Sequence, residues 1–341
     1  MMKLKETLFE LTTAIGVAGE EFSAAQDACE KLKEFAPDAK VDFFGNVIGN
    51  IGERNDKKPH LLLDAHIDEI GFIVTHITDD GFLKVSNCGG VDRRLLLAQQ
   101  VSIFGSETIK GIITSIPPHL EDDDKKVPKM DDIYIDIGMS KEQAEKTVSL
   151  GDRGVIDARA CQLLNDRVTS KAIDDRSGVL VILNTLEKLK GKPLPYSITA
   201  LFSAQEETGE RGAKTAAFKI NPDLAIAIDV SFALTADDSV HKCGELSKGA
   251  MIGIAPSLSK SMSDELIRVA KEKDIPYQLE VMDGTTGTNA DVIGVTRSGV
   301  KTVTVSVPLK YMHTPVEVVS LNDIENTSEL LAEFILQGGV K

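Results

Sequence analysis

Two adjacent glutamates, Glu206 and Glu207, stand where an apolar run ends in the stretch LFSAQEETGERGA (201–213). Neighbouring like charges repel, and burial of either carboxylate in an apolar core is unfavourable. The pair therefore predicts a partner of opposite charge, such as a metal ion. Adjacent residues of an extended chain project to opposite sides, which favours different roles for the two carboxylates. One would bind the metal and the other would move protons.

Ionisable side chains also stand at the ends of three other apolar runs and at the start of one helical pattern. They are His66 with Asp68, Asp229, His313, and the adjacent pair Asp174 and Asp175. Each residue alone has a structural explanation, such as a helix N-cap or a hydrogen-bonded histidine before a turn. Together they form the nitrogen and oxygen ligand set that suits Zn²⁺, Co²⁺ or Mn²⁺. Because the carboxylates outnumber the needs of one ion, we expect two.

The spacing of His66 and Asp68 indicates a further division of labour. Residues two apart on a strand share a face, so Asp68 is placed to accept a hydrogen bond from the ring nitrogen of His66 that does not face the metal. We therefore expect Asp68 to orient the ligand without binding the ion itself.

The elements that must position these side chains alternate along the chain. Strand-like apolar runs occupy 60–68, 196–207, 223–231 and 301–314, and helical periodicity marks 4–15, 22–32, 174–191, 211–219, 263–274 and 322–339. This alternation predicts an α/β fold, a three-layer α/β/α domain with a mainly parallel sheet. Since parallel strands end at one edge of the sheet, the ionisable residues should converge there.

Residues 72–164 have a different character. Short β-rich segments separated by Asp-Gly, Gly-Ser and Gly-Asp turns predict a small β-barrel-like domain, with one helix at 140–148. The charge run at 119–132 is typical of a solvated loop. The predicted organisation is a catalytic domain built from 1–71 and 165–341, with 72–164 inserted into it.

Composition excludes several classes of function. The 341-residue chain carries a net charge of −15, which disfavours nucleic acid and anionic membranes as partners. Its four cysteines form no CxxC pair, which argues against a zinc knuckle and a secreted disulfide framework. The first residues lack the apolar stretch of a signal peptide, so a cytoplasmic location is expected.

Five motifs, in order, resemble those of the M42 family of dinuclear metallo-aminopeptidases. They are AHIDEIGF, KAIDDRSG, SAQEETGERGA, AIDVS and YMHTPVE, spanning residues 65–317. The resemblance implies a zinc-peptidase-like catalytic domain that releases amino-terminal residues from peptides, with two divalent ions per subunit, Zn²⁺ or Co²⁺, and Mn²⁺ as a further candidate. It also implies that the inserted domain dimerises and that dimers build a homo-oligomer, a tetrahedral dodecamer.

The resemblance assigns a role to each candidate residue. The implied metal ligands are His66, Asp174, Glu207, Asp229 and His313. The carboxylate of Asp174 would bridge the two ions, and the resemblance also implies a cis peptide bond between Asp174 and Asp175. Glu206 would be the general base and Asp68 the residue that orients His66. Two positions depart from the family pattern, Asn289 in place of Asp and Lys310 in place of Arg.

Other functions remain open on the sequence alone. The nearest is another di-metal deacylase or carboxypeptidase-type amidohydrolase, which would share the sheet and much of the ligand set. A glycoside hydrolase would need two carboxyl groups about 5 to 10 Å apart on either side of one bond, which adjacent glutamates do not supply. A binding assembly with a vestigial metal centre is the third alternative.

Overall fold

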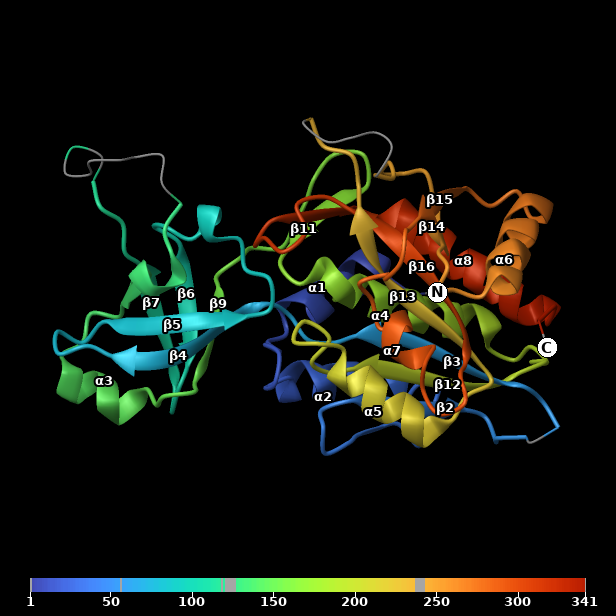
Figure 1. The fold of residues 1–341 in the computed structure, drawn as a ribbon, viewed down its shortest axis with the longest axis horizontal. Helices are drawn as coiled ribbons and strands as arrows, with labels where there is room; N and C mark the ends of the chain where they lie inside the picture. Colours follow the sequence, from blue (N-terminus) through green and yellow to red (C-terminus); the bar gives the residue numbers. More distant parts are fainter. Residues whose placement is uncertain (1, 56, 118, 120–126, 237–242, 341) are drawn as a thin grey trace.

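The structure is a computed structural model that describes residues 2–55, 57–117, 119, 127–236 and 243–340. It has two parts side by side, a large sheet flanked by helices and a smaller barrel, and both chain ends lie on the larger part (Figure 1). Residues 120–126 of the predicted solvated loop lie outside the described ranges. Within those ranges, no helix combines the length and apolar character needed to cross a bilayer.

The larger part is built on an eight-stranded sheet with the order β1-β2-β12-β3-β13-β16-β14-β15. The strands are β1 (Lys40–Val41), β2 (Val47–Ile51), β3 (His60–His66), β12 (Ser197–Ser203), β13 (Leu224–Phe232), β14 (Ala250–Ile254), β15 (Tyr277–Val281) and β16 (Lys301–Leu309). The four central strands, β12, β3, β13 and β16, run parallel to one another. These are the four strands expected from the apolar runs, and their carboxyl ends meet at one edge.

Helices cover both faces of this sheet and complete the three layers (Figure 1). They are α1 (Leu4–Thr13), α2 (Phe22–Leu32), α4 (Ile173–Leu189), α5 (Arg211–Ile220), α6 (Lys260–Glu272), α7 (Ala290–Ile293) and α8 (Leu321–Gln337). The main core packs α1, α2, α4, α6 and α8 against one face through residues such as Leu63, Phe202 and Val305. On the other face a smaller cluster joins α5 and α7 to Leu62 and Leu201. The predicted α/β/α architecture is confirmed.

The smaller part is a closed barrel with the strand order β4-β5-β8-β7-β6-β9. Its strands are β4 (Gly71–Ile77), β5 (Leu83–Cys88), β6 (Gln100–Phe104), β7 (Thr108–Ile113), β8 (Tyr134–Asp136) and β9 (Arg153–Ile156). Alternating residues such as Phe72, Ile103 and Ile135 fill its interior as a separate core. The helix expected at 140–148 is present as α3 (Lys141–Thr147), and 3₁₀ turns occur at η1 (Arg93–Leu95) and η3 (Met130–Asp132).

A third, small sheet lies where the chain returns from the barrel to the larger part. It pairs β10 (Cys161–Gln162), β11 (Arg167–Ser170) and β17 (Glu317–Ser320) in antiparallel fashion. The β11 strand leads directly into α4, and β17 follows the turn that carries His313. This pairing therefore fixes two segments of the site that are distant in sequence.

Candidate active site

One carboxylate, that of Asp174, lies between two imidazoles at the carboxyl edge of the sheet. Its Oδ1 is 3.0 Å from Nε2 of His66, and its Oδ2 is 3.3 Å from Nε2 of His313. His66 is the last residue of β3, His313 lies in the turn between β16 and β17, and Asp174 lies at the start of α4. The topology therefore brings together residues that are 247 positions apart in the chain.

Two sets of possible metal ligands meet at Asp174. His66, Asp174 and Asp229 form one set, and Asp174, Glu207 and His313 form the other. In each set the ligand atoms lie within 4.8 Å of one another. Imidazole nitrogens and carboxylate oxygens in this number fit divalent ions of borderline softness, so the residues present suit the expected two-metal site.

The backbone around Asp174 is held by a single carboxylate, that of Glu317. Its Oε2 accepts hydrogen bonds from the N–H groups of Ile173 at 2.7 Å and Asp174 at 3.1 Å. Its Oε1 accepts one from the N–H of His313 at 2.9 Å. The peptide between Asp174 and Asp175 is cis, as the family resemblance implies. Glu317 thus sets the position of the shared ligand and one histidine together.

Both histidines turn Nε2 toward Asp174 because their other ring nitrogen is engaged. Nδ1 of His313 lies 3.1 Å from the backbone oxygen of Gly90, at the edge of the barrel. Nδ1 of His66 lies 3.2 Å from the backbone oxygen of Asp68. A side chain at Gly90 would place its Cβ 2.6 Å from Nδ1 of His313, so this contact requires glycine. The barrel therefore takes part in orienting a site residue.

The glutamate pair lies in a turn beyond β12, and this differs from the expected extended chain. The carboxylate of Asp68 accepts hydrogen bonds from the N–H groups of Glu206 at 3.0 Å and Glu207 at 3.1 Å. Glu21 accepts one from the preceding N–H, that of Gln205, at 3.2 Å. Two buried carboxylates from elsewhere in the chain thus position three successive peptide groups.

Burial and neighbouring charges shift the pKa values of the ionisable side chains in the site. Burial raises the pKa of Glu206 to about 7 and that of Glu207 to about 8. Burial also acts to raise the pKa of Asp174, but hydrogen bonds from His313 and His66 outweigh it and hold that pKa well below its usual range. The hydrogen bond to Asp174 raises the pKa of His313 to about 9. So many buried carboxylates around two imidazoles favour bound cations.

The structure brings together the five side chains expected as ligands: His66, Asp174, Glu207, Asp229 and His313. Glu206 belongs to neither ligand set and stands in the adjoining turn. The carboxylate of Asp68 lies 3.5 Å from Nδ1 of His66, while its stronger contacts are with the glutamate turn.

Sequence reasoning missed Glu317, Glu21 and Gly90, whose roles depend on long-range packing. Glu317 lies four residues after His313, but that spacing alone indicates no contact. Asn289, the departure from the family pattern, donates hydrogen bonds to Oδ2 of Asp64 and Oγ of Ser203, both at 2.8 Å. Asn289 is therefore a buried neighbour of strands β3 and β12.

Comparison with known proteins agrees with this geometry. A model of the M42 glutamyl aminopeptidase family matches residues 45–330. The chain belongs to the M42 peptidase family. This M42 protein is 33% identical to the lysyl aminopeptidase of Pyrococcus furiosus, over 95% of this chain and 94% of that one. The resemblance seen in the five motifs is confirmed, and the protein is an aminopeptidase.

Solved structures similar to the M42 chain include two archaeal peptidases. An aminopeptidase from Desulfurococcus kamchatkensis has a TM-score of 0.91 at 36% identity, covering 98% of this chain and 95% of that one. Pyrococcus horikoshii TET1 peptidase has a TM-score of 0.86 at 33% identity, covering 98% and 100%. The TET1 peptidase assembles into a tetrahedron or a large octahedral shell.

Proposed function

We propose that the protein is a metal-dependent aminopeptidase that hydrolyses the first peptide bond of peptides with two divalent ions per subunit. Zn²⁺ and Co²⁺ are the favoured ions, and Mn²⁺ is a further candidate. The observation that carries the proposal is the sharing of Asp174 between two ligand sets. His66 and Asp229 would complete one ion's ligands, and Glu207 and His313 the other's.

When bound, the ions would polarise the scissile carbonyl and lower the pKa of the attacking water. Glu206 would accept a proton from that water while the water oxygen forms a bond to the carbonyl carbon. As the carbon–nitrogen bond breaks, Glu206 would return the proton to the leaving amine nitrogen. Its place in the turn beside Glu207, outside both ligand sets, supports this role.

Asp68 would act by positioning. Its carboxylate holds the peptide groups of both glutamates, and its backbone oxygen is the partner of Nδ1 of His66. Asp68 thus orients the expected ligand His66, the expected base Glu206 and the expected ligand Glu207. Fixed geometry of this kind keeps reacting groups aligned before substrate arrives.

The test is hydrolysis of a broad peptide panel by protein loaded with Co²⁺ or Zn²⁺. We expect release of amino-terminal residues, loss of activity in chelator and its recovery when metal is restored. Peptides with acetylated amino termini serve as the matched control and should remain intact. Cleavage of the acetylated peptides would instead identify a deacylase or another amidohydrolase, and inactivity on the whole panel would overturn the proposal.

We also propose that residues 72–164 form the association domain of a homo-oligomer built from dimers, up to a dodecamer. The similarity to the assembling TET1 peptidase and the separate core of the barrel support this. Sedimentation should then give a mass several times the 36.8 kDa of one chain. A mass near that of the single chain would overturn the proposal.

A further inference from the structure

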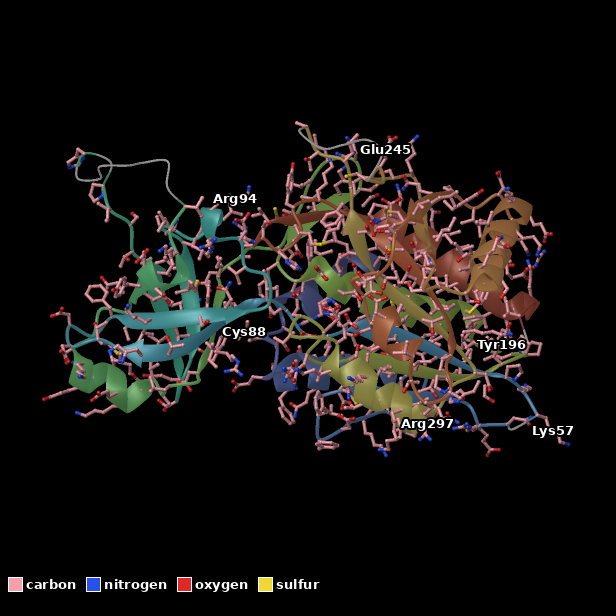
Figure 2. The ribbon with its side chains drawn as sticks, viewed as in Figure 1. Lys57, Cys88, Arg94, Tyr196, Glu245 and Arg297 are labelled. Atoms are coloured by element: carbon pink, nitrogen blue, oxygen red, sulfur yellow. The ribbon has the colours of Figure 1, made fainter. Side chains whose placement is uncertain are left out.

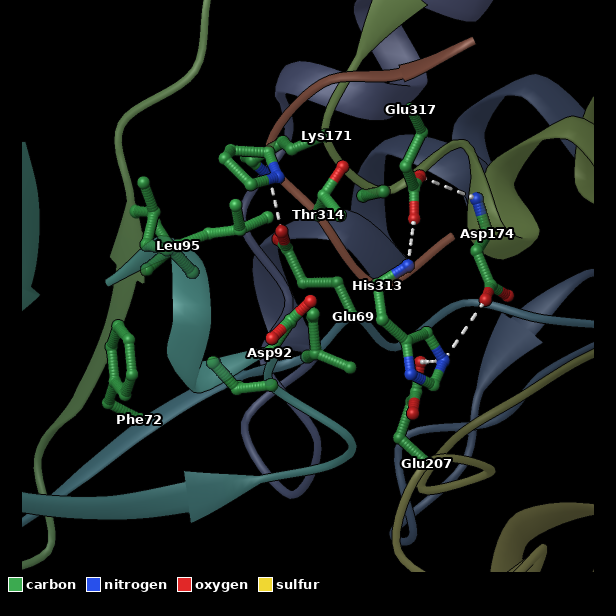
Figure 3. A pocket seen from close by; sticks show the side chains of 17 residues that line it. Glu69, Phe72, Asp92, Leu95, Lys171, Asp174, Glu207, His313, Thr314 and Glu317 are labelled. Carbon is green, nitrogen blue, oxygen red and sulfur yellow. Dashed lines mark hydrogen bonds and ion pairs between the residues drawn. The ribbon is translucent and has the colours of Figure 1, made fainter. Parts of the chain in front are cut away.

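A pocket opens beside the ligand residues, between the barrel and the larger part of the molecule. The pocket is narrow, and about 540 Å³ of space lies between its walls when the open solvent at its mouth is counted. Asp174, Glu207 and His313 form one end. Figure 3 shows Leu95 and Phe72 across the pocket from these three residues. A peptide whose first carbonyl lies at the ligand residues has this space directly beside it.

The wall away from the ligand residues is largely apolar. It is formed by Ile70, Phe72, Val91, Leu95, Val155, Ile156 and Pro315. Most of these come from the barrel and its η1 turn, whereas the ligand end comes from the sheet and α4. Binding of an apolar side chain here would transfer its surface from water to an apolar environment, which is favourable.

Charged residues also line the pocket, but each already has a partner. Oε2 of Glu69 lies 2.5 Å from Nζ of Lys171, and its Oε1 accepts a hydrogen bond from the N–H of Gly16 at 3.0 Å. The side chains of Lys171 and Glu69 are only 12% and 3% exposed. Glu317 is occupied by three backbone N–H groups. Glu69 and Lys171 therefore neutralise one another within the wall, and backbone groups already occupy the oxygens of Glu317.

Asp92 is the remaining carboxylate of the wall, and Arg94 engages it. Nε of Arg94 lies 2.9 Å from Oδ1 of Asp92, and Nη2 lies 2.6 Å from Oδ2. The N–H of Arg94 also donates to Oδ1 at 3.0 Å. Figure 2 shows Arg94 at the surface of the barrel, and its hydrogen bonds lower the pKa of Asp92. Asp92 is therefore paired in a forked contact with Arg94, although the Arg94 side chain is largely exposed.

We propose that this pocket receives the side chain of the substrate's first residue and selects uncharged apolar side chains, such as leucine and methionine. Lysine or glutamate in the same place would lose water against a largely apolar wall whose buried ion pair, Lys171 with Glu69, is already formed, which costs binding. The inference rests on the proposed aminopeptidase function. It separates this chain from relatives whose names specify lysyl or glutamyl substrates.

The experiment compares kcat/KM for fluorogenic aminoacyl amides of leucine, methionine, lysine and glutamate on the metal-loaded enzyme. We expect leucine and methionine to exceed lysine and glutamate by at least about tenfold. Equal or greater kcat/KM for lysine or glutamate would overturn the pocket assignment while leaving the aminopeptidase proposal intact. Hydrolysis of none of the four amides would count against both.

A pair of variants tests the pocket wall directly. Leu95→Glu places a carboxylate in the wall at a residue that is 39% exposed, so the fold should tolerate it. The leucine-to-lysine ratio of kcat/KM should fall at least tenfold. Leu97→Glu is the matched control, because Leu97 is 40% exposed and lies outside the pocket lining.

The control should keep the wild-type ratio, and both variants should keep the wild-type mass in solution. A ratio unchanged in Leu95→Glu, or changed equally in both variants, would overturn the assignment. A lysine preference in the wild type that Asp92→Asn abolishes would show that Asp92 recruits a basic residue, and this too would overturn it.

Discussion

The carboxylate of Asp68 accepts a hydrogen bond from the backbone N–H of Glu207 at 3.1 Å, and its other oxygen accepts one from the N–H of Glu206 at 3.0 Å. Asp68 is fully buried, and it belongs to the link that leads from β3 into the barrel. The glutamate turn follows β12, the parallel neighbour of β3. A loss of this carboxylate should therefore disturb the turn and the metal ligands together.

Asp68→Asn should lower metal affinity and kcat by about 10- to 100-fold, because the amide nitrogen cannot accept one of the two N–H groups. Calorimetric titration with Co²⁺ and steady-state kinetics on one peptide would measure both. Asp132→Asn, at an exposed site on the barrel, is the matched control and should match the wild type. Unchanged affinity and rate in Asp68→Asn would rule out the positioning role.

Replacing each glutamate separately should give different defects. Glu206→Gln should keep both ions and lose about 10²- to 10⁴-fold in kcat, because the base is removed and the ligands remain. Glu207→Gln should lose metal affinity, because a charged ligand becomes a neutral one. Elemental analysis of dialysed protein and kcat at saturating metal distinguish the two. If both variants lose metal to the same extent, the division of roles is wrong.

The fold could be predicted from sequence where the pattern was strong. The four apolar runs became the central parallel strands, and their ends did bring His66 and His313 to one carboxylate. The outer strands of the sheet, β1 and β2 on one side and β14 and β15 on the other, were missed, as was the small sheet of β10, β11 and β17. Strands this short are stabilised by their neighbours and carry little periodicity of their own.

The site shows the same limit at the level of single contacts. The spacing of His66 and Asp68 indicated their proximity, but β3 ends at His66, and the chain then turns the Asp68 carboxylate toward the glutamate turn. The glutamates were expected on an extended chain, yet β12 ends at Ser203. Contacts such as Glu317 with the N–H of Asp174 join segments 143 residues apart, and no local pattern encodes them.

Asp174→Ala should reduce the bound metal from two ions per chain to one or fewer. Its two oxygens face different histidines, so the substitution removes a ligand from both sets at once. Asp229→Ala is the informative comparison, because Asp229 belongs to one set only. It should leave one ion tightly bound, as measured by elemental analysis after dialysis. Two retained ions in Asp174→Ala would contradict the shared position.

Glu21 gives a prediction about stability and pH. Burial raises its pKa to about 7, and its Oε1 accepts hydrogen bonds from the N–H groups of Gly19 at 2.6 Å and Gln205 at 3.2 Å. The pKa of glutamate in the unfolded chain is about 4.3. The protonated Glu21 side chain therefore makes its full contribution to the free energy of unfolding below that pH. This contribution is lost progressively as the pH rises to about 7.

Glu21→Gln keeps an oxygen for both N–H groups and removes the titration. Between pH 5 and 8 the wild type should therefore lose about 2 kcal/mol more of its unfolding free energy than the variant does. Urea unfolding in chelator, at equal protein concentration, measures this difference without a contribution from metal binding. Glu20→Gln is the control, because the neighbouring Glu20 is exposed to water, and it should follow the wild-type profile. Parallel profiles for Glu21→Gln and the wild type would show that the buried carboxylate does not govern this pH dependence.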